Sequence, residues 1–276
     1  MIVYRELSSL EQDLGISAKT LYAVSNNLSK HYRKAKLPKK SGGFRNLSVP
    51  DEVLKSIQKQ IAEVLLIHSP TSRYAKAYRF GSSTLRNAKH HVGKQVVLKL
   101  DILHFFDSIR YSTVKDKVFP EEIYAEPLRI LLTMLCYHKD ALPQGAPSSP
   151  AVTNIILYDF DEKVGAFCAA KNIAYTRYCD DMTFSDDFDP KEVIAKVQAE
   201  LGKLHLFLNE KKTVVLNLES ANKEVSRRMI DFLCGAAYAN HGKMKRVANN
   251  TYIITPYNVD IMGDLLDELE HSGVIF

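Results

Sequence analysis

Cysteine is scarce in this sequence, and its spacing is not that of a metal site. The four cysteines form no Cys-x-x-Cys motif, and they stand at Cys136, Cys168, Cys179 and Cys234. This pattern argues against zinc or a disulfide framework and suits the reducing cytoplasm. No apolar run approaches the roughly 18 residues of a membrane span, so we expect no membrane partner. The opening residues turn acidic and polar too early for a signal peptide, so we expect a cytoplasmic protein.

Internal repeats and low-complexity linkers are also missing. Of the 276 residues, 46% are apolar and 25% are charged, which is ordinary globular usage. This composition excludes a disordered chain, a collagen-like repeat and a coiled coil. The length allows one large domain or two modest ones.

Acidic residues are absent from two long stretches of the N-terminal third. Residues 28–50 and residues 71–99 each contain seven Lys or Arg and no Asp or Glu, although the net charge is only +5. The positive electrostatic potential of such stretches favours binding of a polyanion, because phosphate contacts release condensed counterions. The alternative is a solvated basic surface without a partner.

Hydrophobic spacing predicts an alternation of helices and strands. Helices are expected at 10–35, 51–68, 126–137, 152–167 and 190–204. Strands are expected at 96–101, 174–178, 182–185, 206–208 and 213–216, with a β-hairpin around the turn at 39–45. This order predicts an α+β fold with a mainly antiparallel sheet.

Three carboxylates stand where chemistry is expected. Asp180 and Asp181 are adjacent between two apolar strands, and Asp101 ends another strand. Neighbouring acids repel each other unless a cation lies between them. Carboxylates from separate strand ends can hold two Mg²⁺ ions for phosphoryl transfer. The alternative is a simple polar turn.

Four motifs occur in an order that is typical of one polymerase family. They read LKLDILHFFDSI at 98–109, LPQGAPSSP at 142–150 with Asn154 after it, YCDD at 178–181 and NEKKT at 209–213. On these motifs the chain resembles reverse transcriptases. The pocket motif and the sequence NAKHH at 87–91 resemble most closely those of bacterial retron enzymes.

The resemblance implies a right-handed polymerase fold with fingers, an antiparallel palm and a reduced thumb. Fingers would comprise 1–95 and 112–150, and the first palm strand 96–111. The palm and primer-grip hairpin would follow at 151–255, and a rudimentary thumb helix at 256–276. The implied activity is RNA-directed DNA synthesis with two Mg²⁺ ions, for which Mn²⁺ could substitute.

The resemblance also assigns roles to single residues. Asp101, Asp180 and Asp181, with the backbone of Ile102, would ligate the metal ions. Phe106 would be the steric gate against a ribose 2′-OH, unless it is a core aromatic beside Phe105. The nucleotide would contact Arg45, Gln144 and Lys212. The RNA would contact Arg79, Asn87 and His91, although Arg79 and Lys212 could equally be solvated cations.

Two departures from the retron pattern lie near the C-terminus. Leu233-Cys234-Gly235 stands where a Val-Thr-Gly motif is usual. A primer-grip hairpin is expected around 228–252, and only one amphipathic helix, at 258–270, is expected after it. A single helix cannot clamp a duplex, so we expect bound RNA, a second copy or another protein to supply the missing wall. In the YCDD motif, Cys179 replaces the alanine that is usual in retron enzymes. Because the side chain stays small, we expect the chemistry to be unaffected.

Retron membership would imply a dedicated structured noncoding RNA as template and primer. The products would be cDNA and a branched RNA–DNA made from dNTPs, in antiphage defence with an effector protein. Two alternatives stay open. One is another defence-associated reverse transcriptase that is template-independent or protein-primed. The other is a non-catalytic RNA-binding module.

Overall fold

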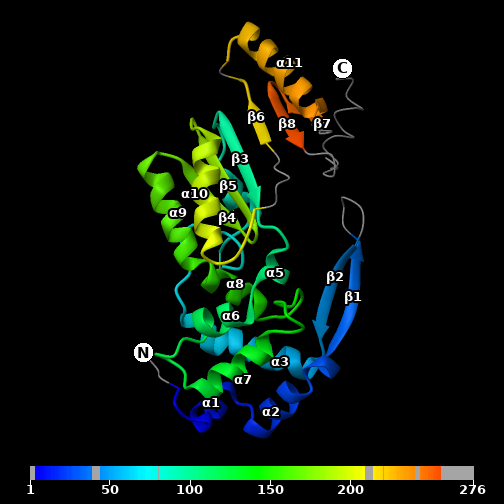
Figure 1. Cartoon of the computed structure of the whole chain (residues 1–276), viewed down its shortest axis with the longest axis vertical. Helices are drawn as coiled ribbons and strands as arrows, with labels where there is room; N and C mark the ends of the chain where they lie inside the picture. Colours follow the sequence, from blue (N-terminus) through cyan, green and yellow to red (C-terminus); the bar gives the residue numbers. More distant parts are fainter. Residues whose placement is uncertain are drawn as a thin grey trace.

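A computed structural model describes residues 4–38, 44–79, 81–208, 214–219, 221–239 and 243–255. The molecule is elongated, with α1, α2, α3 and α7 at one end and α11 at the other (Figure 1). A long antiparallel sheet connects the middle of the molecule to the α11 end. No strand pair in the described sheets is parallel, which agrees with the predicted α+β class.

The N-terminal region is more broken than expected. In place of one helix over 10–35, it forms α1 (Leu7–Leu14), α2 (Ala18–Asn26) and a short 3₁₀ turn (Leu28–His31). Gly15 ends α1 in a left-handed conformation, and the Ser17 side chain then caps α2 by accepting a bond from the Thr20 N–H.

The expected β-hairpin is present. Strand β1 (Tyr32–Pro38) pairs antiparallel with β2 (Phe44–Pro50), so residues predicted to end the first helix belong to a strand. The turn at 39–43 lies outside the described residues. Figure 1 shows the hairpin standing along one side of the molecule.

Between the hairpin and strand β3 (Val96–Asp101), the predicted helix at 51–68 is present. Asp51 caps α3 (Glu52–Gln60), which continues through a π turn (Ile61–Leu65) and a 3₁₀ turn (Leu66–His68), as expected for 51–68. The chain then runs to a short helix, α4 (Thr84–Lys89).

Five helices lie between strand β3 and the next strand of the main sheet. They are α5 (Phe105–Ser108), α6 (Tyr111–Val118), α7 (Glu126–Cys136), α8 (Ser149–Ile156) and α9 (Tyr158–Ala170). The sequence predicted α7 correctly but predicted α8 and α9 as one helix, which is broken at Leu157. Asp189 caps the next helix, α10 (Pro190–Gly202), as expected.

The main sheet has six strands in the order β4-β5-β3-β6-β8-β7. Their bounds are β3 (Val96–Asp101), β4 (Ala174–Tyr178), β5 (Asp181–Asp186), β6 (Val214–Asn217), β7 (Lys243–Ala248) and β8 (Thr251–Thr255). The strand predicted at 206–208 is not formed. That segment makes a bridge between Leu208 and Ile102, and its Phe207 carbonyl accepts a 2.8 Å bond from the Leu103 N–H. Strand β6 pairs with the opposite end of β3, at Val96–Leu98.

The region after β6 also differs from the prediction. Helix α11 (Lys223–Ala239) occupies the first half of the expected primer-grip hairpin, and only β7 and β8 form a hairpin. The reason is the spacing of Ser226, Ile230, Leu233 and Ala237, whose side chains are buried or half-buried on one face of a helix. The helix predicted at 258–270 lies outside the described residues.

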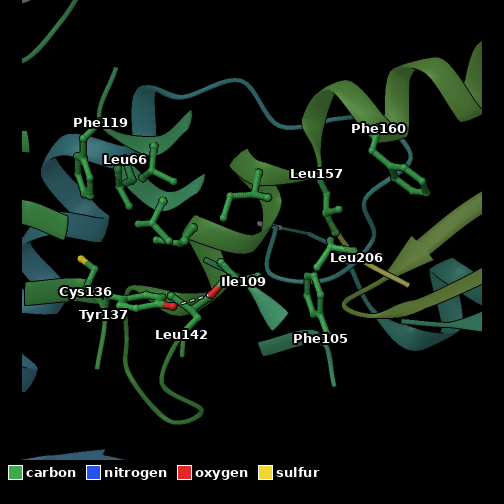
Figure 2. Packing of buried hydrophobic residues seen from close by; sticks show 14 of the residues in the cluster. Leu66, Phe105, Ile109, Phe119, Cys136, Tyr137, Leu142, Leu157, Phe160 and Leu206 are labelled. Carbon is green, nitrogen blue, oxygen red and sulfur yellow. Dashed lines mark hydrogen bonds between the residues drawn. The ribbon is translucent and has the colours of Figure 1, made fainter. Parts of the chain in front are cut away.

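One hydrophobic core extends from the N-terminal helices to the sheet. Figure 2 shows its middle, where Phe119 and Leu66 lie at one side and Phe105 and Leu206 at the other. The Tyr137 hydroxyl donates a 2.9 Å bond to the carbonyl of Ile109 within this core. Burial raises the pKa of the Cys136 thiol to about 12, so this cysteine stays a neutral core residue.

Candidate active site

Two of the three predicted catalytic carboxylates are neighbours across the sheet. Asp101 is the last residue of β3 and Asp181 the first of β5, and the antiparallel register pairs them directly. Asp180 precedes Asp181 in the tight turn that joins β4 to β5. Because paired positions in a ladder have Cβ atoms roughly 5 Å apart, the three carboxylates gather at one end of the sheet.

The turn that carries Asp180 has a demanding backbone. Cys179 adopts φ 61°, the left-handed region that costs a non-glycine residue energy. Two contacts hold it there: the Arg177 guanidinium donates a 2.8 Å bond to the Cys179 carbonyl, and the Tyr78 hydroxyl lies 3.3 Å from the Cys179 sulfur. Burial raises the pKa of the Cys179 thiol to about 11, so it stays protonated.

Burial makes the charged form of Asp181 unfavourable. Burial raises the pKa of this carboxyl, Lys99 lowers it, and Asp180 raises it further, with a net upward direction. The Lys99 ammonium lies 3.6 Å from the Asp181 carboxylate. The negative charge here is therefore compensated only in part by the protein.

The donor set at this end of the sheet suits a divalent cation. Among the residues that the structure describes, no group of three or more His, Cys, Asp or Glu is already arranged to hold a metal ion. The available ligands are hard oxygens from the carboxylates of Asp101, Asp180 and Asp181, which Mg²⁺ prefers. Burial, and then the charge of Asp180, raises the pKa of Asp181, and such an ion would stabilise the charged carboxylate.

A fully buried ion pair lies beneath the turn. The Arg177 guanidinium donates to Asp161 at 2.9 and 2.7 Å and to the Asn154 amide oxygen at 3.2 Å, and both charged side chains are 0% exposed. Burial lowers the pKa of Arg177, but Asp161 raises it more, so the guanidinium stays charged. The same guanidinium holds the Cys179 carbonyl, so it positions the turn of Asp180.

Arg177 and Asp161 were not among the predicted site residues. The available signal was the arginine itself, because a charged residue at a buried position of an apolar strand needs a partner. The partner is on α9, and no spacing rule connects it to β4.

The predicted nucleotide pocket brings three separate segments together. The Gln144 carbonyl accepts a 2.9 Å bond from the Ser48 N–H, which joins the loop 142–150 to strand β2. The Leu142 N–H donates a 3.0 Å bond to the carbonyl of Phe106, which joins the same loop to α5. Gln144 is half-buried in this arrangement, whereas Arg45 is exposed on β2. Lys212 lies outside the described residues.

Two residues predicted to contact RNA face the protein. Both ring nitrogens of His91 are hydrogen-bonded at 2.7 Å, one with the Ser185 hydroxyl and the other with the Thr176 hydroxyl. These bonds attach the segment after α4 to β4 and β5. The Asn87 amide oxygen is buried without a hydrogen-bond partner.

Comparison with known proteins identifies the family. The family model described as reverse transcriptase (RNA-dependent DNA polymerase) matches residues 37–247. The chain belongs to the reverse transcriptase family.

The relatives of this reverse transcriptase include several retron enzymes. It is 35% identical over 164 residues to the retron Ec83 reverse transcriptase of Escherichia coli, covering 56% of this chain and 53% of that protein. It is 29% identical over 225 residues to the retron Ec86 reverse transcriptase of Escherichia coli, covering 80% and 70%. These similarities confirm the predicted retron-type resemblance, although the chain spans only about half the length of the first relative.

A second similarity is of a different kind. The reverse transcriptase is 46% identical over 67 residues to the cell division protein SepF of Acetivibrio thermocellus. That match covers 24% of this chain and 43% of SepF.

None of the helices that the structure describes combines the length and apolarity needed to cross a bilayer.

Replacing the predicted gate residue of this reverse transcriptase should change its choice of sugar. Phe106 packs against the core beside Phe105, with ring centroids 5.4 Å apart, and its carbonyl holds the pocket loop. Phe106→Val keeps that backbone bond and removes the ring, so we expect ribonucleotide use to rise about tenfold or more. Single-nucleotide extension with dNTP and NTP measures the ratio. An unchanged ratio would show that Phe106 is only a core aromatic.

Stability of the reverse transcriptase should depend on pH through His91. Burial lowers the pKa of His91 to about 4, with smaller contributions from His90 and Lys94, from the ordinary value of 6.5. The unfolded chain therefore binds this proton between about pH 6.5 and 4 while the folded chain does not, so stability falls as the pH falls through that window. Urea titrations across this range give the free energy of unfolding at each pH. This free energy should change less steeply with pH in His91→Gln than in the wild type. Equal slopes would contradict this account.

Proposed function

We propose that this reverse transcriptase copies RNA into DNA from dNTPs by two-metal nucleotidyl transfer. The observation that carries the proposal is the pairing of Asp101 with Asp181 beside Asp180 at one sheet end. Carboxylates at separate strand ends are the arrangement that metal-dependent phosphoryl transfer needs. The match to the family model supports the same activity.

The metal ligands would come from the carboxylates at this end of the sheet. Asp101, Asp180 and Asp181, with the Ile102 carbonyl, would hold two Mg²⁺ ions, which Mn²⁺ could replace. When bound, these ions activate the attacking hydroxyl and stabilise charge on the phosphates.

Other side chains would handle the nucleotide. Arg45 and Gln144 would orient the triphosphate, since a guanidinium fork suits phosphate oxygens. Phe106 would exclude the 2′-OH, and Lys212 would give a proton to the departing pyrophosphate. The fingers would comprise 1–95 and 112–150, with the palm beginning at 96–111 and resuming at 151.

The biological setting that we propose is a retron. The similarity of this chain to retron enzymes supports a dedicated structured noncoding RNA, a branched RNA–DNA product and a role in antiphage defence. An effector protein or a second copy would complete the grip on the duplex. We place this activity in the cytoplasm.

The deciding experiment is to purify the protein from its host and sequence the nucleic acid that accompanies it. A unique RNA joined to short DNA supports the retron assignment. Labelled DNA that stays on the protein after RNase treatment would instead indicate protein priming. RNA without any DNA, and no dNTP incorporation in vitro, would favour the non-catalytic binding module.

A second function is favoured by the SepF similarity. We propose that this match falls on the unit of β6, α11, β7 and β8, because the reverse transcriptase motifs end at residue 213. The chain continues for 68 residues after Leu208, about the length of the match. The polymerase family model overlaps the first part of this unit, up to residue 247. The unit would be a cell-division module rather than a primer grip.

The outer face of α11 supports an interaction role for this unit. It exposes Val225, Met229 and Phe232 at helical spacing, and Phe232 is 73% exposed. An exposed apolar patch of this kind on a helix is typical of a protein contact surface.

A fluorescent fusion of the full chain tests this second function. We expect it to collect at the division site, and we expect Phe232→Glu to disperse it while dNTP incorporation is retained. Lys191→Glu on α10 is the control for added negative charge. Loss of incorporation in Phe232→Glu, with localisation retained, would show that the unit serves the polymerase instead.

A further inference from the structure

A small hollow of basic character lies beside the edge strand β4. Its volume is about 350 Å³, and its lining residues are Lys76, Arg79, Gly81, Ser82, Arg86, Lys89 and His90. Five of these seven are Lys, Arg or His, and none is acidic.

The positive charges in this hollow are not balanced by the protein. In the described part of the chain, no ion pair joins any of them to a carboxylate. Instead, Arg79 donates to the Ser72 carbonyl at 2.9 Å, and Arg86 donates to the Gly81 carbonyl. Burial, and then Arg79, lowers the pKa of Lys76. Like charges held together in this way repel each other unless an anion lies between them.

The floor of the hollow is fixed to the strand that leads to the catalytic turn. The Lys76 N–H donates to the Arg177 carbonyl at 2.7 Å, and the Arg177 N–H donates to the Tyr74 carbonyl at 2.8 Å. The Tyr74 ring fills the space over Gly165, where an added Cβ would lie 2.0 Å from it. His91 attaches the other side of the hollow to β4 and β5. An anion bound here would therefore stand at a fixed place relative to Asp180.

We propose that this hollow binds a backbone phosphate of the RNA strand. The inference rests on the proposed reverse transcriptase function. Guanidinium and ammonium groups are the donors that recognise phosphate oxygens. A phosphate could also come from the incoming triphosphate, but the pocket proposed for it is built by β2, α5 and the loop 142–150. The hollow lies instead on the segment along β4, so the RNA backbone is the occupant that fits.

Salt-dependent RNA binding tests the proposal. The variant is Arg86→Gln with Lys89→Gln, and the matched control is Lys163→Gln with Lys191→Gln, which removes two exposed charges from α9 and α10. A labelled single-stranded oligouridine is titrated between about 50 and 200 mM salt. Losing one phosphate contact should flatten the plot of log K against log salt by about 0.7. We expect about tenfold weaker binding near physiological salt, and the control should lie close to wild type.

Two further measurements keep the outcomes distinct. The KM for dTTP, measured with saturating DNA-primed RNA template, reports on the triphosphate: a higher KM with an unchanged salt slope would overturn the proposal in favour of the nucleotide. A salt slope equal to that of the control would also overturn it. The single variant Lys89→Gln changes an exposed side chain and should fold normally, so it tests the hollow even if the double variant misfolds. Because binding needs no catalysis, wild-type protein that incorporates no dNTP would refute the proposed function without touching this result.

Discussion

Asp180→Asn should reduce dNTP incorporation by about a thousandfold or more, which corresponds to about 4 kcal/mol of transition-state stabilisation. The substitution removes one negative charge from a site where Asp101 and Asp181 already lie across from each other. An amide is a poor ligand for Mg²⁺ in comparison with a carboxylate. Extension of a DNA primer on an RNA template measures the effect.

The control for this variant is Asp187→Asn, which removes an exposed carboxylate beyond β5. We expect it to retain wild-type activity. RNA affinity should be nearly unchanged in both variants, because the basic tracts are intact. Asp180→Asn protein that keeps more than a tenth of wild-type activity would show that the three aspartates do not form the catalytic site.

Asp161→Leu should destabilise the folded protein by about 3–5 kcal/mol, because it leaves the Arg177 guanidinium buried without its carboxylate. The Tyr175 hydroxyl, which donates a 2.7 Å bond to Asp161, would also lose its acceptor. Urea unfolding followed by circular dichroism measures the loss.

The double variant Asp161→Leu with Arg177→Met separates stability from positioning. Replacing both charges with apolar groups should recover most of the unfolding free energy, since the desolvation cost of the pair disappears as well. Activity should stay low, because the bond from Arg177 to the Cys179 carbonyl is not restored. Recovery of both stability and activity would mean that Arg177 has only a structural role.

The sequence predicted local structure well where one element determines its own pattern. Helices α3, α7 and α10 and strands β3, β4 and β5 lie where the apolar spacing and the caps at Asp51 and Asp189 placed them. The carboxylate cluster was also predictable, because Asp101 and Asp181 sit at the ends of apolar strands that pair in register.

Long-range features were not predictable in the same way. The partner of Arg177 lies on another helix, and the inward orientation of His91 depends on hydroxyl groups of β4 and β5. The segment 206–208 has a strand-like pattern, but its backbone bonds are made to Ile102 and Leu103, just beyond the end of β3. In each case the outcome depends on a neighbour that is distant in sequence, which no periodicity reports.

The position of β3 in the sheet has a consequence for folding on the ribosome. This strand carries Asp101, and one of its two neighbours, β6, is synthesised more than a hundred residues later. Contacts of such high sequence separation form late and slowly. Strand β3 therefore gains its full set of backbone partners only after β6 has been released. A nascent chain lacking that strand leaves Val96–Leu98 at an open sheet edge, so completion of the sheet is a late event in the synthesis of this protein.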